Sequence, residues 1–285
     1  MAENHMMNIG DCQLGLYEKA LTFDWDWEKK LSMVKELGFD FMEFSVDADH
    51  KDRLDFTEKE ITLIRDTSWR LQVPLNTLAL TANRFYPLGS KNDEVREEGK
   101  LLVKKAVALA VKLGIRIVQI AAYDVFDEEG DEETDRLFIE SMRECEPIAA
   151  RAGVMLAFET MDSPYAGSVE RCKRLVDILG SPWIHIYADT GNIAAIGLDF
   201  TKDILTGPSH LIAIHLKDAT PGISRDIEFG TGIVDFDADF KALKQINYGG
   251  FFIAEMWWQD NPEYLDKVKE ASRFLREKIK TADMA

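Results

Sequence analysis

The amino-acid sequence predicts an α/β fold, a (β/α)₈ TIM barrel in a single domain. Eight short apolar segments recur along the 285 residues, and amphipathic segments of helical period lie between them. Strands that alternate with helices form parallel sheets, and eight such units make up one barrel of this length. A doubly wound open sheet is the alternative. However, the first apolar segment continues into YEKALTFDW, which lacks the glycine-rich phosphate loop typical of that fold.

The predicted strands are nearly continuous in apolar residues, as expected of a parallel sheet that is covered on both faces. They lie at residues 14–17, 41–46, 75–80, 117–123, 154–160, 184–189, 211–216 and 251–256. The last strand belongs to the run FFIAEMWW, in which Glu255 is the one residue that is not apolar. A buried carboxylate is costly without a partner, so this glutamate points to a function.

Helical period is clearest at residues 27–38, 95–114, 136–153 and 168–180. Each of these segments ends on a glycine, which can adopt the left-handed conformation that closes a helix. The acidic stretch 126–135 is predicted to be a solvated loop and the start of a helix. Residues 1–10 are predicted to form a flexible tail, and residues 11–285 the barrel domain.

The charge of the chain bears on its partners. It has 34 basic and 51 acidic residues, a net charge of −17, which argues against nucleic acid or an anionic membrane as a partner. Three cysteines without a paired motif predict no disulfide framework. We find neither a signal peptide nor an apolar run of the roughly 18 residues that a membrane span needs. We therefore expect a soluble, cytoplasmic protein.

Four consecutive predicted strands each carry one ionisable residue near the C-terminal end, where barrels build their active sites. These residues are Glu159, Asp189, His215 and Glu255. Each of them alone would more often be a helix cap, an ion-pair partner or a core histidine, but their coincidence on four strands favours a site for one divalent metal ion. The oxygen-rich set suits Mn²⁺ or Mg²⁺, and the imidazole also admits Co²⁺ or Zn²⁺.

Other polar residues near strand ends are candidates for substrate binding. Glu43 interrupts the second strand and would orient a ligand or pair with a cation. Lys217 shares a face with His215 and would meet a substrate oxygen or phosphate, unless it pairs with Asp218. The turn FGTGIVDF offers the amides of Gly230 and Gly232 to a phosphate, although a simple tight turn is the alternative. Further charge partners for a phosphate are Lys19, Arg84 and Arg225. We expect His185, Tyr187 and His210 to serve packing.

Several stretches, taken in order, resemble the L-ribulose-5-phosphate 3-epimerases, also called L-xylulose-5-phosphate 3-epimerases, of the xylose-isomerase-like TIM-barrel superfamily. They include LGLYEKAL (14–21), ELGFDFMEFSVD (36–47), GIRIVQIAAYDV (114–125), ETMD (159–162), HLKDATPG (215–222) and IAEMW (253–257). The resemblance implies that the four strand-end residues bind the metal, with Mn²⁺ favoured, and that Glu159 and Glu255 also form the acid/base pair. It further implies a homodimer, and the motif D-x-G-N adds Asn192 to the substrate-binding candidates.

One loop departs from the family pattern. Where the family usually reads His-Arg-Arg-Phe-Pro-Leu-Gly, this chain reads NRFYPLG, so that Asn83 and Phe85 replace the histidine and the second arginine. If this loop binds phosphate, only Arg84 remains for it. The exact sugar and its phosphorylation therefore stay open.

The resemblance implies a metal-dependent epimerase that inverts C3 of a 2-ketopentose phosphate (L-ribulose 5-phosphate or L-xylulose 5-phosphate) through an enediolate. The alternatives are an aldose–ketose isomerase acting on a hexulose phosphate and an epimerase of unphosphorylated ketoses. A metal-dependent sugar-phosphate sensor would need the metal ligands but not two opposed bases. A DNA-repair enzyme resembling endonuclease IV is disfavoured by the acidic charge and by a count of five histidines.

Overall fold

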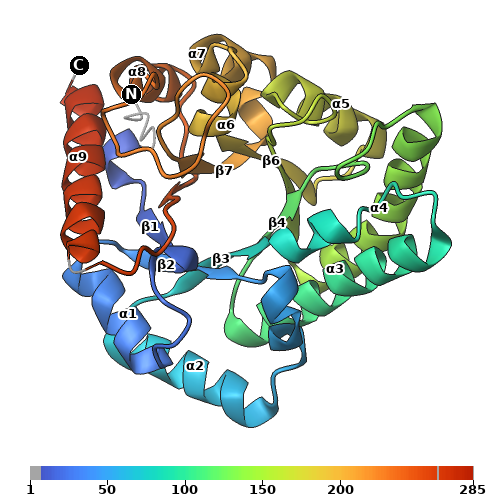
Figure 1. The fold of residues 1–285 in the computed structure, drawn as a ribbon, viewed down its shortest axis with the longest axis horizontal. Coiled ribbons are helices and arrows are strands. Elements are labelled where there is room, and N and C mark those ends of the chain that lie inside the picture. The colour runs from blue at the N-terminus through green and yellow to red at the C-terminus, as the bar shows by residue number, and fades with distance from the viewer. Residues whose placement is uncertain (1–7, 262, 285) are drawn as a thin grey trace, which may run out of the picture.

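The computed structural model describes residues 8–261 and 263–284, which fold into a closed barrel of eight parallel strands (Figure 1). Each strand pairs with the next one in the chain, and β1 pairs with β8 to close the barrel. The strands are β1 (Leu14–Tyr17), β2 (Phe41–Ser45), β3 (Leu75–Leu80), β4 (Ile117–Ala121), β5 (Met155–Glu159), β6 (Ile184–Asp189), β7 (Leu211–Leu216) and β8 (Phe251–Ala254). The predicted fold class is confirmed.

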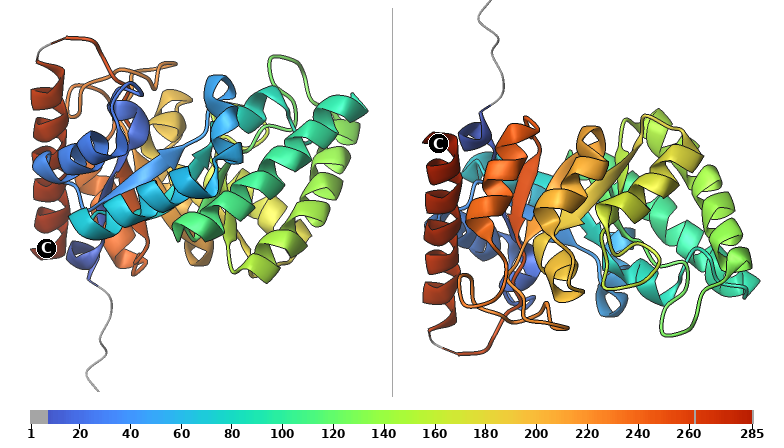
Figure 2. Two further views of the ribbon diagram at one scale, coloured as in Figure 1. Left: turned by 90° about the horizontal axis from the view of Figure 1, so that it is seen from below. Right: turned by 90° about the horizontal axis from the view of Figure 1, so that it is seen from above.

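Helices surround the barrel, and Figure 2 shows the long loops after β7 and β8 at one end of it. The α-helices are α1 (Trp27–Glu36), α2 (Glu58–Leu71), α3 (Asp93–Leu113), α4 (Glu132–Ala152), α5 (Val169–Leu179), α6 (Thr190–Ala195), α7 (Phe200–Asp203), α8 (Phe236–Gln245) and α9 (Tyr264–Met284). Short 3₁₀ helices are η1 (Ile9–Asp11), η2 (Glu18–Ala20), η3 (Ala48–Asp55), η4 (Thr81–Phe85), η5 (Ile204–Thr206) and η6 (Pro208–His210). No helix of the described residues is long and apolar enough to cross a bilayer.

The predicted boundaries hold for four strands and shift at the others. Residues 14–17, 75–80, 184–189 and 211–216 are strands as predicted. The eighth strand ends at Ala254, so Glu255 follows the strand instead of lying inside it. Its N–H still donates to the carbonyl of Leu216 at 2.9 Å, and this bond places the side chain beside the end of β7.

The four predicted helices are present as α1, α3, α4 and α5, and the glycine after each has a positive φ, between +59° and +89°. The acidic stretch leads into α4, where Asp131 accepts from the N–H groups of Glu133 and Thr134. Sequence reasoning did not name α2, although Thr57 and Glu60 form a capping box at its start.

The predicted tail, residues 1–10, requires a correction at its C-terminal end. Residues 1–7 lie outside the described residues, but Ile9 is buried in the core within η1. The side chain of Asn8 donates to the carboxylate of Asp283 at 3.0 Å, near the end of α9. Residues 8–10 therefore belong to the barrel domain, because an apolar side chain anchors them.

The barrel has two apolar layers, and together they leave little room for polar side chains except toward its ends. One layer lies between the strands and the surrounding helices. The other fills the barrel interior with residues from all eight strands: Tyr17, Phe41, Ala79, Ile117, Ala157, Tyr187, Ala213 and Ile253. Because the interior is packed, polar side chains that point inward gather above this layer.

Candidate active site

The four predicted metal ligands meet at one point. Each of them offers one ligand atom, and these atoms lie within 4.8 Å of one another. Glu159 ends β5, Asp189 ends β6, His215 lies on β7, and Glu255 directly follows β8. All four are buried, with exposures of 7% or less. The strand ends thus bring together three carboxylates and one imidazole that are far apart in the sequence.

Hydrogen bonds and ion pairs connect the cluster internally. The Nδ1 atom of His215 is 2.8 Å from Oε1 of Glu159 and 3.7 Å from Oε2 of Glu255. The ammonium group of Lys217 lies 2.8 Å from Oδ2 of Asp189 and 2.6 Å from Oε2 of Glu255. Lys217 therefore belongs to the same cluster, and the ion pair with its neighbour Asp218 that sequence reasoning considered is not formed.

The charges within the cluster are unequal. Burial raises the pKa of the Asp189 carboxyl to about 8, despite the opposing charge of Lys217. Burial would also raise the pKa of Glu255, but Lys217 and His215 outweigh it and lower that pKa to about 2. One lysine is thus shared by two carboxylates and cannot neutralise both. A divalent cation would supply the missing positive charge, so the donor set fits one metal ion.

Neighbouring groups orient two of the carboxylates. Asp189 caps α6, because its Oδ1 atom accepts from the N–H of Asn192 at 2.8 Å. The side chain of Gln119, on β4, donates to Oε2 of Glu159. Sequence reasoning missed Gln119, although it interrupts the apolar run IVQIAAY much as Glu255 interrupts the last strand. The side chain of Asn192 donates to the carbonyl of Thr160 and accepts from Ser224, so it links β5 to the loop after β7.

Glu43 does not lie where a substrate would contact it. Its side chain is fully buried, and its Oε2 atom is 2.6 Å from Nε2 of His215. Two roles were considered for Glu43 from the sequence, orienting a ligand or pairing with a cation. The contact with His215 is of the second kind, because a protonated imidazole is a cation. Tyr187, which was expected to serve packing, donates its hydroxyl to the same carboxylate at 2.5 Å.

The amides of Gly230 and Gly232 are not directed at a ligand, which corrects the predicted phosphate-binding turn. Both donate to Oδ2 of Asp218, at 2.9 and 2.8 Å. The N–H groups of Ala219 and Val234 donate to the other oxygen of the same carboxylate. Asp218 thus holds the loop after β7 with four backbone hydrogen bonds. Its carboxylate occupies the amides that a substrate phosphate would need.

Of the three remaining cationic candidates, Lys19 and Arg225 line one pocket together with Trp257, and Arg84 does not line it. Lys19 forms an ion pair with Asp47. Arg225 is largely exposed and lies over the ring of Trp257, with its guanidinium carbon 4.7 Å from the ring centre. Arg84 lies over the rings of Tyr123 and Phe126, at 5.7 Å from each centre. Within residues 8–261 and 263–284, no salt bridge joins Arg84 to a carboxylate.

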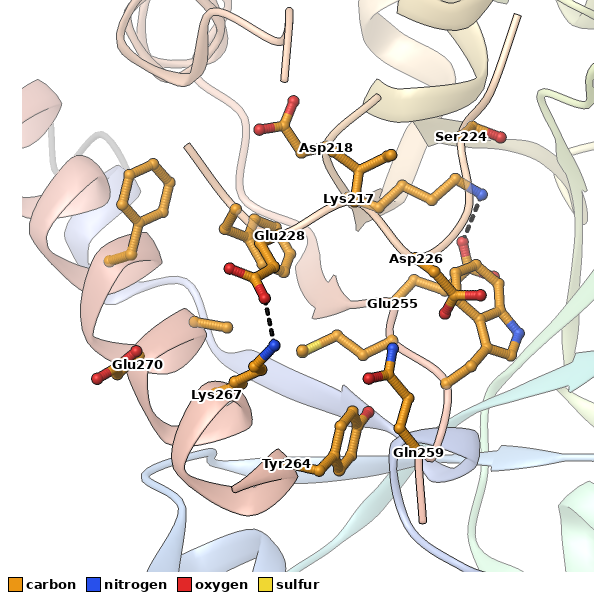
Figure 3. A pocket seen from close by; sticks show the side chains of 16 residues that line it. Lys217, Asp218, Ser224, Asp226, Glu228, Glu255, Gln259, Tyr264, Lys267 and Glu270 are labelled. Atoms are coloured by element: carbon orange, nitrogen blue, oxygen red, sulfur yellow. Dashed lines mark hydrogen bonds and ion pairs between the residues drawn. The ribbon is translucent and has the colours of Figure 1, made fainter. Parts of the chain in front are cut away.

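A cavity of about 260 Å³ adjoins the cluster between the loop after β7 and helix α9 (Figure 3). Lys217 and Glu255 line one side of it, and an ion pair between Lys267 and Glu228 lies on the side of α9. The remaining charged residues of its lining are all acidic: Asp218, Asp226 and Glu270. Both lysines are held by carboxylates, so this cavity is unsuited to a phosphate group.

Comparison with known proteins agrees with the geometry. The family model described as "Xylose isomerase-like TIM barrel" matches residues 31–278. The L-ribulose-5-phosphate 3-epimerase UlaE of Escherichia coli (strain SMS-3-5 / SECEC) is 36% identical, over 95% of this chain and 96% of that protein. The putative L-ribulose-5-phosphate 3-epimerase SgbU of Haemophilus influenzae is 37% identical, over 95% of this chain and 98% of that protein.

Solved structures share the fold at low identity. A structure of L-ribulose 3-epimerase matches with a TM-score of 0.77 and 20% identity, over 95% of both chains. The D-allulose 3-epimerase of Methylomonas sp. matches with a TM-score of 0.78 and 19% identity, over 94% of this chain and 98% of that one.

Proposed function

Because this chain belongs to the xylose isomerase-like TIM barrel family, and within it to the L-ribulose-5-phosphate 3-epimerases, we propose that it inverts C3 of a 2-ketopentose 5-phosphate. The substrates would be L-ribulose 5-phosphate and L-xylulose 5-phosphate. The single observation that carries this proposal is that two buried glutamates, Glu159 and Glu255, reach the same cluster from different strands.

Epimerisation needs two proton-transferring groups on opposite faces of one carbon atom. One glutamate removes the proton from C3, and the electron pair of the C–H bond moves into the C2–C3 bond while the carbonyl oxygen takes negative charge. The other glutamate then returns a proton to the opposite face of C3, and the carbonyl forms again. Glu159 at the end of β5 and Glu255 after β8 are three strands apart around the barrel, so they would approach a substrate above the cluster from different directions.

The cluster as a whole would also bind a metal ion. Glu159, Asp189, His215 and Glu255 would hold one divalent ion, and we propose Mn²⁺, with Mg²⁺, Co²⁺ and Zn²⁺ also compatible with the donor set. When bound, such an ion polarises the substrate carbonyl and stabilises negative charge on its oxygen. Lys217 is close enough to Glu255 to influence its proton affinity.

The phosphate of the substrate would lie on the side of the barrel mouth formed by the loops after β3 and β4. The cavity beside α9 is acidic, whereas Arg84 has no carboxylate partner among the described residues and lies against Tyr123. Tyr123 packs with Ala121, the residue of β4 that pairs in register with Glu159, so this tyrosine lies on the β4–β5 side of the cluster. Arg84 is therefore the preferred phosphate-binding residue of this proposal.

We further propose a cytoplasmic location and assembly as a homodimer. Cys12, Cys145 and Cys172 are free and buried, which suits a reducing cytoplasm. Assembly as a homodimer rests on the family resemblance, and light scattering coupled to size-exclusion chromatography tests it.

The reaction is tested by NMR of the purified protein with Mn²⁺ and L-ribulose 5-phosphate in D₂O. Epimerisation predicts L-xylulose 5-phosphate with deuterium at C3. Formation of an aldose with deuterium at C2 would instead show aldose–ketose isomerisation, which the same cluster could support. Absence of any exchange with phosphorylated or unphosphorylated ketoses would contradict both, and would favour a sugar-phosphate sensor.

A further inference from the structure

We infer that Glu43 is a positioning residue, which holds the imidazole of His215 so that its Nδ1 atom faces the three carboxylates. This inference rests on the proposed function, because the orientation matters only if His215 binds a cation. It concerns a residue that neither the strand-end pattern nor the family resemblance assigned to the metal.

The location of Glu43 excludes direct contact with a substrate. The residue lies in the middle of β2, pairs in register with Tyr17 of β1, and is 0% exposed. Its carboxylate therefore lies inside the barrel, below the metal cluster. A carboxylate in such a place is stable only if donors surround it.

Three donors from three other strands surround this carboxylate. The hydroxyl groups of Tyr187 on β6 and Thr77 on β3 donate to Oε1, at 2.5 and 2.8 Å. These two bonds fix the plane of the carboxylate and leave Oε2 for His215, whose Nε2 atom lies 2.6 Å away. Rotation of the Glu43 side chain would break all three contacts, so its orientation is set by the barrel itself.

The orientation of His215 follows from this bond. A neutral imidazole carries its proton on one nitrogen and a lone pair on the other. In the metal-free protein Nδ1 lies 2.8 Å from Glu159 and donates to that carboxylate. Loss of this proton on metal binding would leave the lone pair on Nδ1, while Nε2 still donates to Glu43. The rings of Tyr187 and Tyr17 lie 4.7 and 5.7 Å from the imidazole centre and keep it in place. Carboxylates in this position generally orient histidine ligands and strengthen their binding.

Calorimetric titration of the metal-free protein with MnCl₂ tests the inference without any assay of turnover. We expect Glu43→Ala to weaken Mn²⁺ binding by about 10- to 100-fold. Glu43→Gln can still accept the imidazole proton but has no negative charge, so its loss should be smaller. Tyr187→Phe keeps the carboxylate and removes one of its donors, and a loss of several-fold is expected.

Glu18→Gln is the matched control. Glu18 is also a glutamate of 0% exposure, but it contacts Arg53 and Lys30 and not His215. This variant should lose stability and keep the Mn²⁺ affinity of the wild type.

The possible outcomes separate the inference from the proposed function. Wild-type affinity for Mn²⁺ in folded Glu43→Gln and Tyr187→Phe would overturn the inference, even if both variants melt at lower temperature, because Glu43 would then serve packing only. A wild type that binds none of the four candidate metals would overturn the metal site and the inference together. If Glu43→Ala does not fold, the other two variants decide the question.

Discussion

Two buried clusters of charge lie near the C-terminal end of the barrel, and they differ in balance. In the first, Glu18 at the end of β1 accepts from Lys30 and from both terminal nitrogens of Arg53, at 2.8 to 2.9 Å. In the second, the metal cluster, three carboxylates share Lys217 and His215. The first is complete within the protein, and the second lacks positive charge.

The pKa values report this difference. Burial would raise the pKa of Glu18, but Arg53 and Lys30 lower it below its usual range. Burial raises the pKa of Asp189 to about 8, because the charge of Lys217 does not compensate for it. A buried carboxylate is therefore not by itself a sign of function. What marks the second cluster as a candidate site is that several such carboxylates, incompletely neutralised by their neighbours, lie together around one histidine.

The largest expected effect separates the two clusters by activity. Glu159→Gln and Glu255→Gln each remove a group that transfers a proton in the proposed mechanism, so we expect turnover to fall by about 10²- to 10⁴-fold. Glu18→Gln should lower activity only as far as it lowers the folded fraction. Steady-state kinetics at saturating Mn²⁺ measure this. A Glu255→Gln enzyme with normal turnover would remove Glu255 from the mechanism.

The next effect separates the clusters by stability. Glu18→Ala leaves Arg53 and Lys30 buried without their partner, and such a loss costs about 3–5 kcal/mol of the free energy of unfolding. Asp189→Asn, in contrast, should stabilise the metal-free protein at pH 8, because it removes a carboxylate that burial disfavours. Urea denaturation in the presence of a chelator measures both. Equal destabilisation by the two variants would show that both clusters are balanced.

A third prediction concerns pH. The metal-free protein should lose stability as the pH rises from about 5 to 8, because the folded state keeps a proton on Asp189 that the unfolded chain has already released. The raised pKa of His215 acts in the same direction above its unfolded value, since its charged form is the one favoured in the folded state. Saturating Mn²⁺ should remove the part of the slope that comes from Asp189 and His215, because the metal takes the place of their protons.

The control for the pH experiment is Asp239. Burial raises its pKa to about 8 as well, yet it lies on α8, outside the metal cluster. Asp239→Asn should therefore reduce the slope equally with and without Mn²⁺. A slope in the wild type that Mn²⁺ leaves unchanged would contradict the assignment to Asp189.

The sequence was sufficient for the fold and for the finding that Glu159, Asp189, His215 and Glu255 lie together, because both depend on regular patterns. Continuous apolar strands and helix-ending glycines repeat along the chain, and an ionisable residue within an apolar strand stands out. The partners of these residues were harder to predict. Asp218 and the amides of Gly230 and Gly232 meet only when the loop after β7 folds back, and no periodicity describes that loop.

Glu43 shows a second limit of sequence reasoning. Its place inside an apolar strand marked it as unusual, as it did Glu255. Whether such a residue faces the substrate or lies below the cluster depends on its depth in the barrel and on the register of β2 against its neighbours. Those are properties of strand pairing across the whole sheet, and the local sequence does not contain them.

The smallest expected effect extends the comparison from carboxylates to arginines. Arg53 is buried beside Glu18, whereas Arg84 has aromatic neighbours and, among the described residues, no carboxylate partner. By the same reasoning, Arg84 needs an anion, and the substrate phosphate is the candidate.

We expect Arg84→Ala to raise the KM for the ketopentose phosphate by about tenfold, which corresponds to the loss of one charge-assisted hydrogen bond. The KM for the unphosphorylated ketose should stay the same, since it has no phosphate to lose. Arg65→Ala is the matched control, because Arg65 lies exposed on α2 beside Asp66 and should affect neither substrate. An equal rise of KM for both substrates would show that Arg84 shapes the loop after β3 and does not bind phosphate.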